Sequence, residues 1–137
     1  MVDKGVLQVR IDRFRECVEI LEKALGFIPA KFVEDPFVYG SAERHMHLAL
    51  ECLLDIGNHI IADRGYPRPS SDADIFRILI DQDVLPETMR ADLEGMAAFR
   101  NLLVHDYLRL DRHRFYQILV EKLPVLKEVG RRFAALL

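Results

Sequence analysis

The sequence predicts an all-α fold, an up-down bundle of four longer helices with one short helix added. Three observations support this fold class. Apolar residues recur with a spacing close to 3.6 in every long segment, no segment alternates as a strand does, and glycine or proline separates most of the periodic segments. At 137 residues the chain is most simply one domain, residues 1–137, and it is long enough to bury a core.

The first helix is expected from about residue 3 to 27, with Gly26 marking its stop. The connector over residues 27–39 carries Pro29 and Pro36, so we expect a loop or a short irregular helix there.

The second helix is expected over about residues 37–63, ended by Gly65 and the prolines after it. One of its faces carries polar residues three or four positions apart. These residues are Arg44, His47, Glu51, Asp55, Asn58 and His59. Two interpretations stay open: a solvated face with ion pairs fits the first half of this line, whereas the short polar groups of the second half are more typical of a site lining.

A turn over residues 66–71 leads to a short third helix, about 72–82, whose start resembles a capping box of Ser71 and Asp74. Its inward residues are expected to be Ile75, Phe76, Leu79 and Ile80.

Pro86 suits the first turn of a fourth helix that runs from about Glu87 into residues 100–107. After a break near 107–110, Asp111 is expected to cap a last helix over about 112–136. Pro124 should kink that helix.

The composition is that of an ordinary soluble globular protein, with 50% hydrophobic and 30% charged residues. There is no run of 18 apolar residues and no evident signal peptide, so we expect a cytoplasmic protein without membrane contact.

Cys17 and Cys52 fit buried free thiols best, and a disulfide between them stays open. The net charge of -3 argues against nucleic-acid binding by the electrostatic attraction of the whole surface. Contact with RNA therefore needs a local cluster of basic residues, and no DNA partner is expected.

Four groups able to bind or process a phosphate lie within residues 100–107. On an unbroken helix Asn101 and His105 share one face, while Arg100 and Tyr107 share another. Arg100 and His105 are five residues apart and point away from each other. They can meet at one phosphate through the reach of the arginine, a helix end at the motif, or a second subunit. We therefore expect the helix to end near His105 and the protein to dimerise.

These residue types suit RNA cleavage without a metal. The 2′-hydroxyl attacks the phosphorus with help from His105, and Arg100 stabilises the charge on the phosphorane oxygens. Asn101 could orient the imidazole or a phosphate oxygen, and Tyr107 could donate a hydrogen bond, stack on a base or be modified. An arginine and a histidine near a helix C-terminus are also ordinary capping groups, and spacing alone favours that interpretation.

The segment Arg100-Asn101-Leu102-Leu103-Val104-His105-Asp106-Tyr107 resembles the Arg-x4-His-x-Tyr signature of HEPN-domain proteins, and of HepT-like toxins in particular. Ala42-Glu43-Arg44 and Leu54-Asp55-Ile56-Gly57-Asn58-His59-Ile60-Ile61 resemble the long helix of that group. The number and order of the helices agree too, so the resemblance covers essentially the whole chain.

The resemblance implies a HEPN fold and a homodimer with the motif lining a cleft between subunits. It implies a metal-independent endoribonuclease toxin of a type II toxin-antitoxin pair, with RNA as substrate and no cofactor. Its partner would be a minimal nucleotidyltransferase antitoxin that silences it by transferring AMP to Tyr107. Arg100 and His105 carry over as the nuclease pair. Supporting groups would be Asn101 and, orienting Arg100, chiefly Asp55 with Glu51 and Asn58.

Two other functions stay open. One is a catalytically weak helical dimer that binds a nucleotidyltransferase or a nucleotide without cleaving RNA. The other is a structural dimer with no ligand. No metal site is predicted, because His45 and His47 fall on different faces of their helix and His113 is isolated among arginines.

Overall fold

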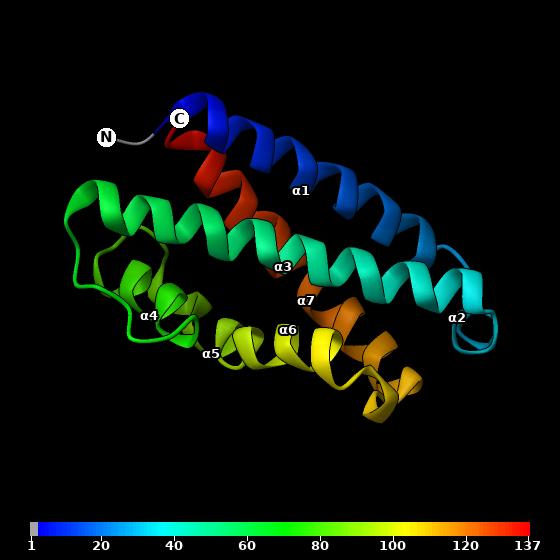
Figure 1. Ribbon diagram of the computed structural model, residues 1–137. Helices are drawn as coiled ribbons and strands as arrows, with labels where there is room; N and C mark the ends of the chain where they lie inside the picture. The colour runs from blue at the N-terminus through cyan, green and yellow to red at the C-terminus, as the bar shows by residue number, and fades with distance from the viewer. Residues whose placement is uncertain (1–2) are drawn as a thin grey trace.

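Helices make up the regular structure of the computed structural model, which describes residues 3–137 except for the side chain of Tyr107 (Figure 1). No strand occurs in this described part of the chain, and the predicted all-α class is confirmed. Three long helices form the frame: α1 (Lys4–Leu25), α3 (Pro36–Arg64) and α7 (Arg112–Ala135). The most extensive contacts between elements join α1 and α3.

The ends of the long helices follow the capping residues of the sequence. The Asp111 carboxylate accepts hydrogen bonds from the backbone N–H groups of His113 and Arg114, at 2.9 and 3.1 Å, as an N-cap should. Gly65 ends α3 in the left-handed conformation, with φ of 67°, which glycine adopts without steric cost. The expected ends at Gly26 and Gly65 and the cap at Asp111 are confirmed.

The connector between α1 and α3 contains a six-residue helix, α2 (Pro29–Glu34). After α3, the helix α4 (Ala73–Asp81) packs against it. The expected capping box does not form, because Asp74 instead accepts hydrogen bonds from Ser70, from the backbone N–H at 3.1 Å and the hydroxyl at 2.5 Å.

The expected fourth helix is divided, and this part of the prediction was wrong. It consists of a 3₁₀ turn η1 (Glu87–Met89), α5 (Arg90–Leu93) and α6 (Met96–His105), with a second 3₁₀ turn η2 (Tyr107–Arg109) after it. The interruption lies at Glu94 and Gly95, where Glu94 is extended and Gly95 has a φ of 83°. The motif therefore sits on a ten-residue helix of its own.

The core lies where α1, α3 and α7 meet, and two glycines let helices approach closely. A Cβ at Gly57 of α3 would lie 2.8 Å from the Ile75 Cγ2 atom of α4, and one at Gly130 of α7 would overlap the Phe14 ring of α1. Among the helices that are described, none combines the length and apolar character needed to cross a membrane.

Candidate functional site

The helix α6 carries the motif and ends within it. His105 is its last residue and is exposed, and the next residue, Asp106, still closes the helix with a 3.0 Å hydrogen bond to the Leu102 carbonyl. The expected break at the motif is therefore present. Tyr107 opens η2, and its side chain lies outside the described part of the structure.

Arg100 is fixed by acceptors at each of its guanidinium nitrogens. Nη1 donates to Glu51 on α3, Nη2 donates to Asp72 just before α4, and Nε donates to Asn101 Oδ1 at 2.9 Å. Only 12% of the side chain is exposed. Burial opposes the charge, but the hydrogen bonds to Asp72 and Glu51 outweigh it and raise the pKa of Arg100 above its ordinary value. The guanidinium is therefore a rigid, permanently charged group.

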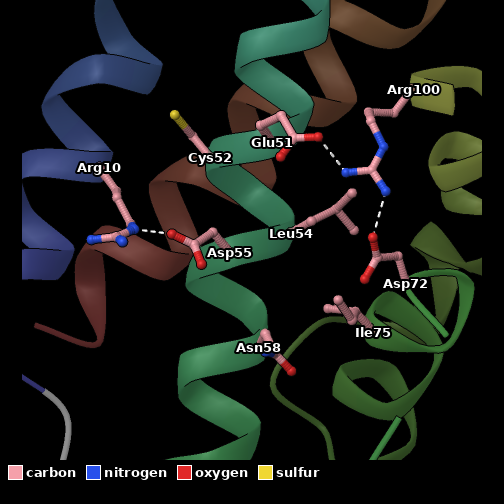
Figure 2. A pocket seen from close by; sticks show the side chains of 9 residues that line it. All are labelled: Arg10, Glu51, Cys52, Leu54, Asp55, Asn58, Asp72, Ile75 and Arg100. Atoms are coloured by element: carbon pink, nitrogen blue, oxygen red, sulfur yellow. Dashed lines mark hydrogen bonds and ion pairs between the residues drawn. The ribbon is translucent and has the colours of Figure 1, made fainter. Parts of the chain in front are cut away.

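A pocket of about 270 Å³ opens beside this guanidinium, between α1, α3 and the start of α4 (Figure 2). Carboxylates and two arginines dominate its wall. The lining residues are Arg10, Glu51, Cys52, Leu54, Asp55, Asn58, Asp72, Ile75 and Arg100. Asp55 and Asn58, from the second half of the polar line on α3, therefore line the pocket together with Glu51 of the first half. Arg44, His47 and His59 are not among the lining residues.

Asp55 does not contact Arg100, contrary to the expectation that it chiefly orients that residue. Figure 2 shows Asp55 turned toward α1, where it accepts a hydrogen bond from Arg10. His59 Nε2 lies 3.7 Å from the other Asp55 oxygen. The reason is helical geometry, since a residue four positions after Glu51 is rotated by about 40° as well as displaced by one turn. Glu51 is the residue of this pair that reaches Arg100.

Asn58 lines the same pocket, and among the described residues it forms no hydrogen bond with Arg100. Its side chain is drawn in Figure 2 one turn below Asp55, away from the guanidinium.

The first half of the polar line is joined to Arg100 through a histidine. Arg44 Nη1 lies 3.1 Å from His47 Nδ1, and His47 Nε2 lies 3.7 Å from the Glu51 oxygen that holds Arg100. Burial, followed by the nearby charges of Arg44 and Arg100, lowers the pKa of His47 despite the opposing effect of Glu51. A neutral His47 therefore sits between two guanidinium groups.

The sequence did not point to Asp72 or Arg10 as parts of the site. Both contact their partners across large separations in the chain, 28 residues to Arg100 for Asp72 and 45 residues to Asp55 for Arg10. The available signal was charge balance, because Glu51 and Asp55 on a half-buried face require cations on neighbouring helices.

Arg100 and His105 are not brought together within one chain. His105 lies outside the pocket, and its side chain forms no hydrogen bond or ion pair with the other described residues. Within that same part of the chain, no three His, Cys, Asp or Glu side chains are arranged to hold a metal ion. Cys17 and Cys52 are free thiols, and burial raises the pKa of Cys52 to about 11.

The chain is similar to known proteins along most of its length. YutE of Bacillus subtilis is 33% identical over 95 residues, which span 69% of this chain and 66%, or just under two thirds, of that protein. The mRNA nuclease HepT of Shewanella oneidensis is 26% identical over 102 residues, 74% of this chain and 76% of that protein.

Solved structures share the fold over nearly the whole chain. The tri-AMPylated Shewanella oneidensis HEPN toxin, solved in complex with MNT antitoxin, has a TM-score of 0.85 at 22% identity and covers 98% of this chain and 99% of that one. The structure of YutE, described as a cytosolic protein of unknown function, has a TM-score of 0.84 at 25% identity and covers 98% of this chain and 90% of that one. The model of the HepT-like ribonuclease family matches residues 14–133, and the chain therefore belongs to that family.

Proposed function

We propose that this protein is the toxin of a toxin-antitoxin pair and that it cleaves RNA without a metal ion, using Arg100 and His105. Membership of the HepT-like ribonuclease family supports the activity. One structural observation carries the assignment of residues: α6 ends at an exposed imidazole, His105, five residues after a guanidinium that is locked in place. A fixed cation and an accessible proton acceptor are the two groups that this reaction needs.

In the proposed reaction His105 accepts the proton of the 2′-hydroxyl while that oxygen attacks the neighbouring phosphorus. Negative charge grows on the phosphorane oxygens, and Arg100 stabilises it. The bond to the 5′-oxygen then breaks, this oxygen takes up a proton from water as it leaves, and the protonated His105 returns its proton to the solvent. The products are a 2′,3′-cyclic phosphate and a 5′-hydroxyl.

We further propose that the active form is a homodimer. Within one chain Arg100 faces inward, toward α3 and α4, whereas His105 lies at the exposed end of α6. A second copy that places its own motif beside this one would supply the missing neighbour of each group. The cleft between the copies would then hold one phosphodiester.

The proposed partner is a minimal nucleotidyltransferase that transfers AMP to Tyr107. A solved HEPN toxin of this fold is tri-AMPylated and bound to MNT antitoxin, which supports the proposal. Tyr107 lies two residues after His105, so an added AMP would bring a bulky anion to the place where the RNA phosphate must bind. We place the pair in the cytoplasm, since the relative YutE is described as cytosolic.

Cleavage in EDTA tests the nuclease. The purified protein should cut RNA and leave 2′,3′-cyclic phosphate ends, and His105→Ala should lose this activity while keeping its helical circular dichroism. A His105→Ala protein that still cuts RNA would remove the imidazole from the mechanism. Co-expression with a minimal nucleotidyltransferase antitoxin should add the mass of AMP to the wild type and not to Tyr107→Phe.

A second candidate function is a dimer that binds a partner or nucleotide without cleavage. The observation in its favour is that Glu51 and Asp72 already occupy the guanidinium of Arg100. A protein that binds RNA in EDTA and leaves it intact would support this candidate.

A further inference from the structure

We infer that Arg44 binds a phosphate of the RNA that flanks the scissile one. This inference rests on the proposed nuclease function and assigns a residue to substrate binding that lies outside the Arg-x4-His motif. It comes from the position of Arg44 on α3, from its lack of an acidic partner, and from the way His47 holds it.

The register of α3 against α6 places Arg44 at the level of His105. The two helices run in opposite directions in Figure 1, and Glu51 of α3 contacts Arg100 of α6. Arg44 precedes Glu51 by seven residues, or about 10 Å along the helix, and His105 follows Arg100 by about 8 Å. Because the helices are antiparallel, both displacements lead in the same direction. Arg44 and His105 therefore lie at the same end of the α3–α6 pair.

Arg44 also differs from the two arginines of the pocket in its charge environment. Arg100 is held by two carboxylates and Arg10 by one. Arg44 is exposed, and its one hydrogen bond to a described residue is with the ring of His47. A phosphate that approaches Arg44 displaces water and no carboxylate. Of the three arginines, Arg44 therefore needs the least free energy to bind a phosphate, because no ion pair has to break.

His47 orients Arg44 without neutralising it. The arginine can only donate, so His47 Nδ1 must accept this hydrogen bond with its lone pair, and the proton of the neutral ring is then on Nε2. That nitrogen faces Glu51 at 3.7 Å. One nitrogen of Arg44 is thus held against α3, and the remaining donors stay available for two phosphate oxygens.

The position of Arg44 also explains how a protein with a negative net charge could bind RNA. With a net charge of -3, the protein needs a local cation to hold RNA. Arg44 supplies that cation at the same end of the α3–α6 pair as the exposed imidazole, while Arg100 is reserved for the reacting phosphate.

Binding of single-stranded RNA blocked by 2′-O-methyl groups tests the inference, since such RNA binds but lacks the attacking hydroxyl. Arg44→Gln should raise the Kd about tenfold, as expected for one charged hydrogen bond. It should also reduce the dependence of log K on log salt by about 0.7, the contribution of one phosphate contact to a single strand. Arg44→Lys, which keeps the charge, should recover part of the loss.

The matched control is Arg131→Gln, which removes the same charge from an exposed arginine of α7 paired with Glu128. It should bind like the wild type. With cleavable RNA, Arg44→Gln should raise KM more than it lowers kcat, which a general loss of structure would not do.

Two results would overturn the inference, and they have different meanings. If the wild type cuts RNA and Arg44→Gln matches it in Kd, salt dependence and KM, Arg44 has no role and the proposed function stands. If the wild type neither cuts RNA nor binds the blocked strand, the proposed function fails and the inference fails with it.

Discussion

Replacing Gly57 by alanine tests how closely α4 must approach α3. Gly57 is buried in the C-terminal third of α3, and a Cβ there would lie 2.8 Å from Ile75 Cγ2 and 3.0 Å from Leu79 Cδ1, both on α4. These distances are well inside van der Waals contact. The new methyl group therefore pushes α4 outward, and Asp72, which directly precedes α4 and holds Arg100, must move with it.

The magnitude follows from two opposing effects. Alanine stabilises a helix interior by about 1 kcal/mol relative to glycine. Overpacking a core costs about 1–3 kcal/mol, and the cost is near the middle of this range because the clashing atoms are methyl ends that can turn partly aside. We expect Gly57→Ala to lower the free energy of unfolding by about 1 kcal/mol.

Gly40→Ala is the matched control, since it lies in the same helix and a Cβ there would meet no atom within 4 Å. It should raise the free energy of unfolding by about 1 kcal/mol, so the two variants should differ by about 2 kcal/mol. Urea unfolding followed by circular dichroism measures both, at one protein concentration because the stability of the proposed dimer would depend on it. A Gly57→Ala protein as stable as Gly40→Ala would refute the close approach of α4 to α3.

Three further predictions concern charges and thiols. Asp72→Asn should slow RNA cleavage about tenfold, the effect of weakening one charged hydrogen bond, whereas Asp55→Asn should change it little; equal losses would contradict the assignment of partners. A hydrogen bond from Arg131 holds the pKa of Glu128 at about 2 in the folded protein, against an ordinary 4.5. Its contribution to stability is therefore present above pH 4.5 and lost as the pH falls toward 2, so melting temperatures should fall less over this range in Glu128→Gln than in the wild type. Cys52, with its pKa raised to about 11, should react slowly with iodoacetamide at pH 8 and about tenfold faster per added pH unit, while a fast reaction at pH 8 would show an accessible thiolate.

The sequence was sufficient to predict those helix ends that local chemistry determines. Helix ends of this kind depend on backbone conformation and hydrogen bonds within a few residues, so the sequence alone predicts them. They are the ends at Gly26 and Gly65 and the start at Asp111. The break at Gly95 was missed because a glycine inside an apolar-periodic segment is tolerated in many helices. Whether such a glycine ends a helix depends on how the helix packs in the folded protein, and the spacing of apolar residues does not show that packing.

The candidate site was predicted in part for the same reason. The spacing of Glu51 and Asp55 on α3 indicated a polar face, but not which of them would reach Arg100. That outcome depends on the rotation between neighbouring helices. Asp72 could not be predicted at all, because the close packing of α4 on α3, and not any local pattern, brings it to the guanidinium.

The left-handed residue Gly95 makes α6 a helix separate from α5, the helix that precedes it. The ten residues of α6 are bounded by the left-handed Gly95 before them and by the helix end at His105 after them. Their own side chains pack this helix against α3. The segment between α4 and Gly95 still contributes Leu85, Met89 and Leu93 to the core. A protein engineer who redesigns this segment should therefore keep these three side chains, the glycine and the packing of α6 on α3.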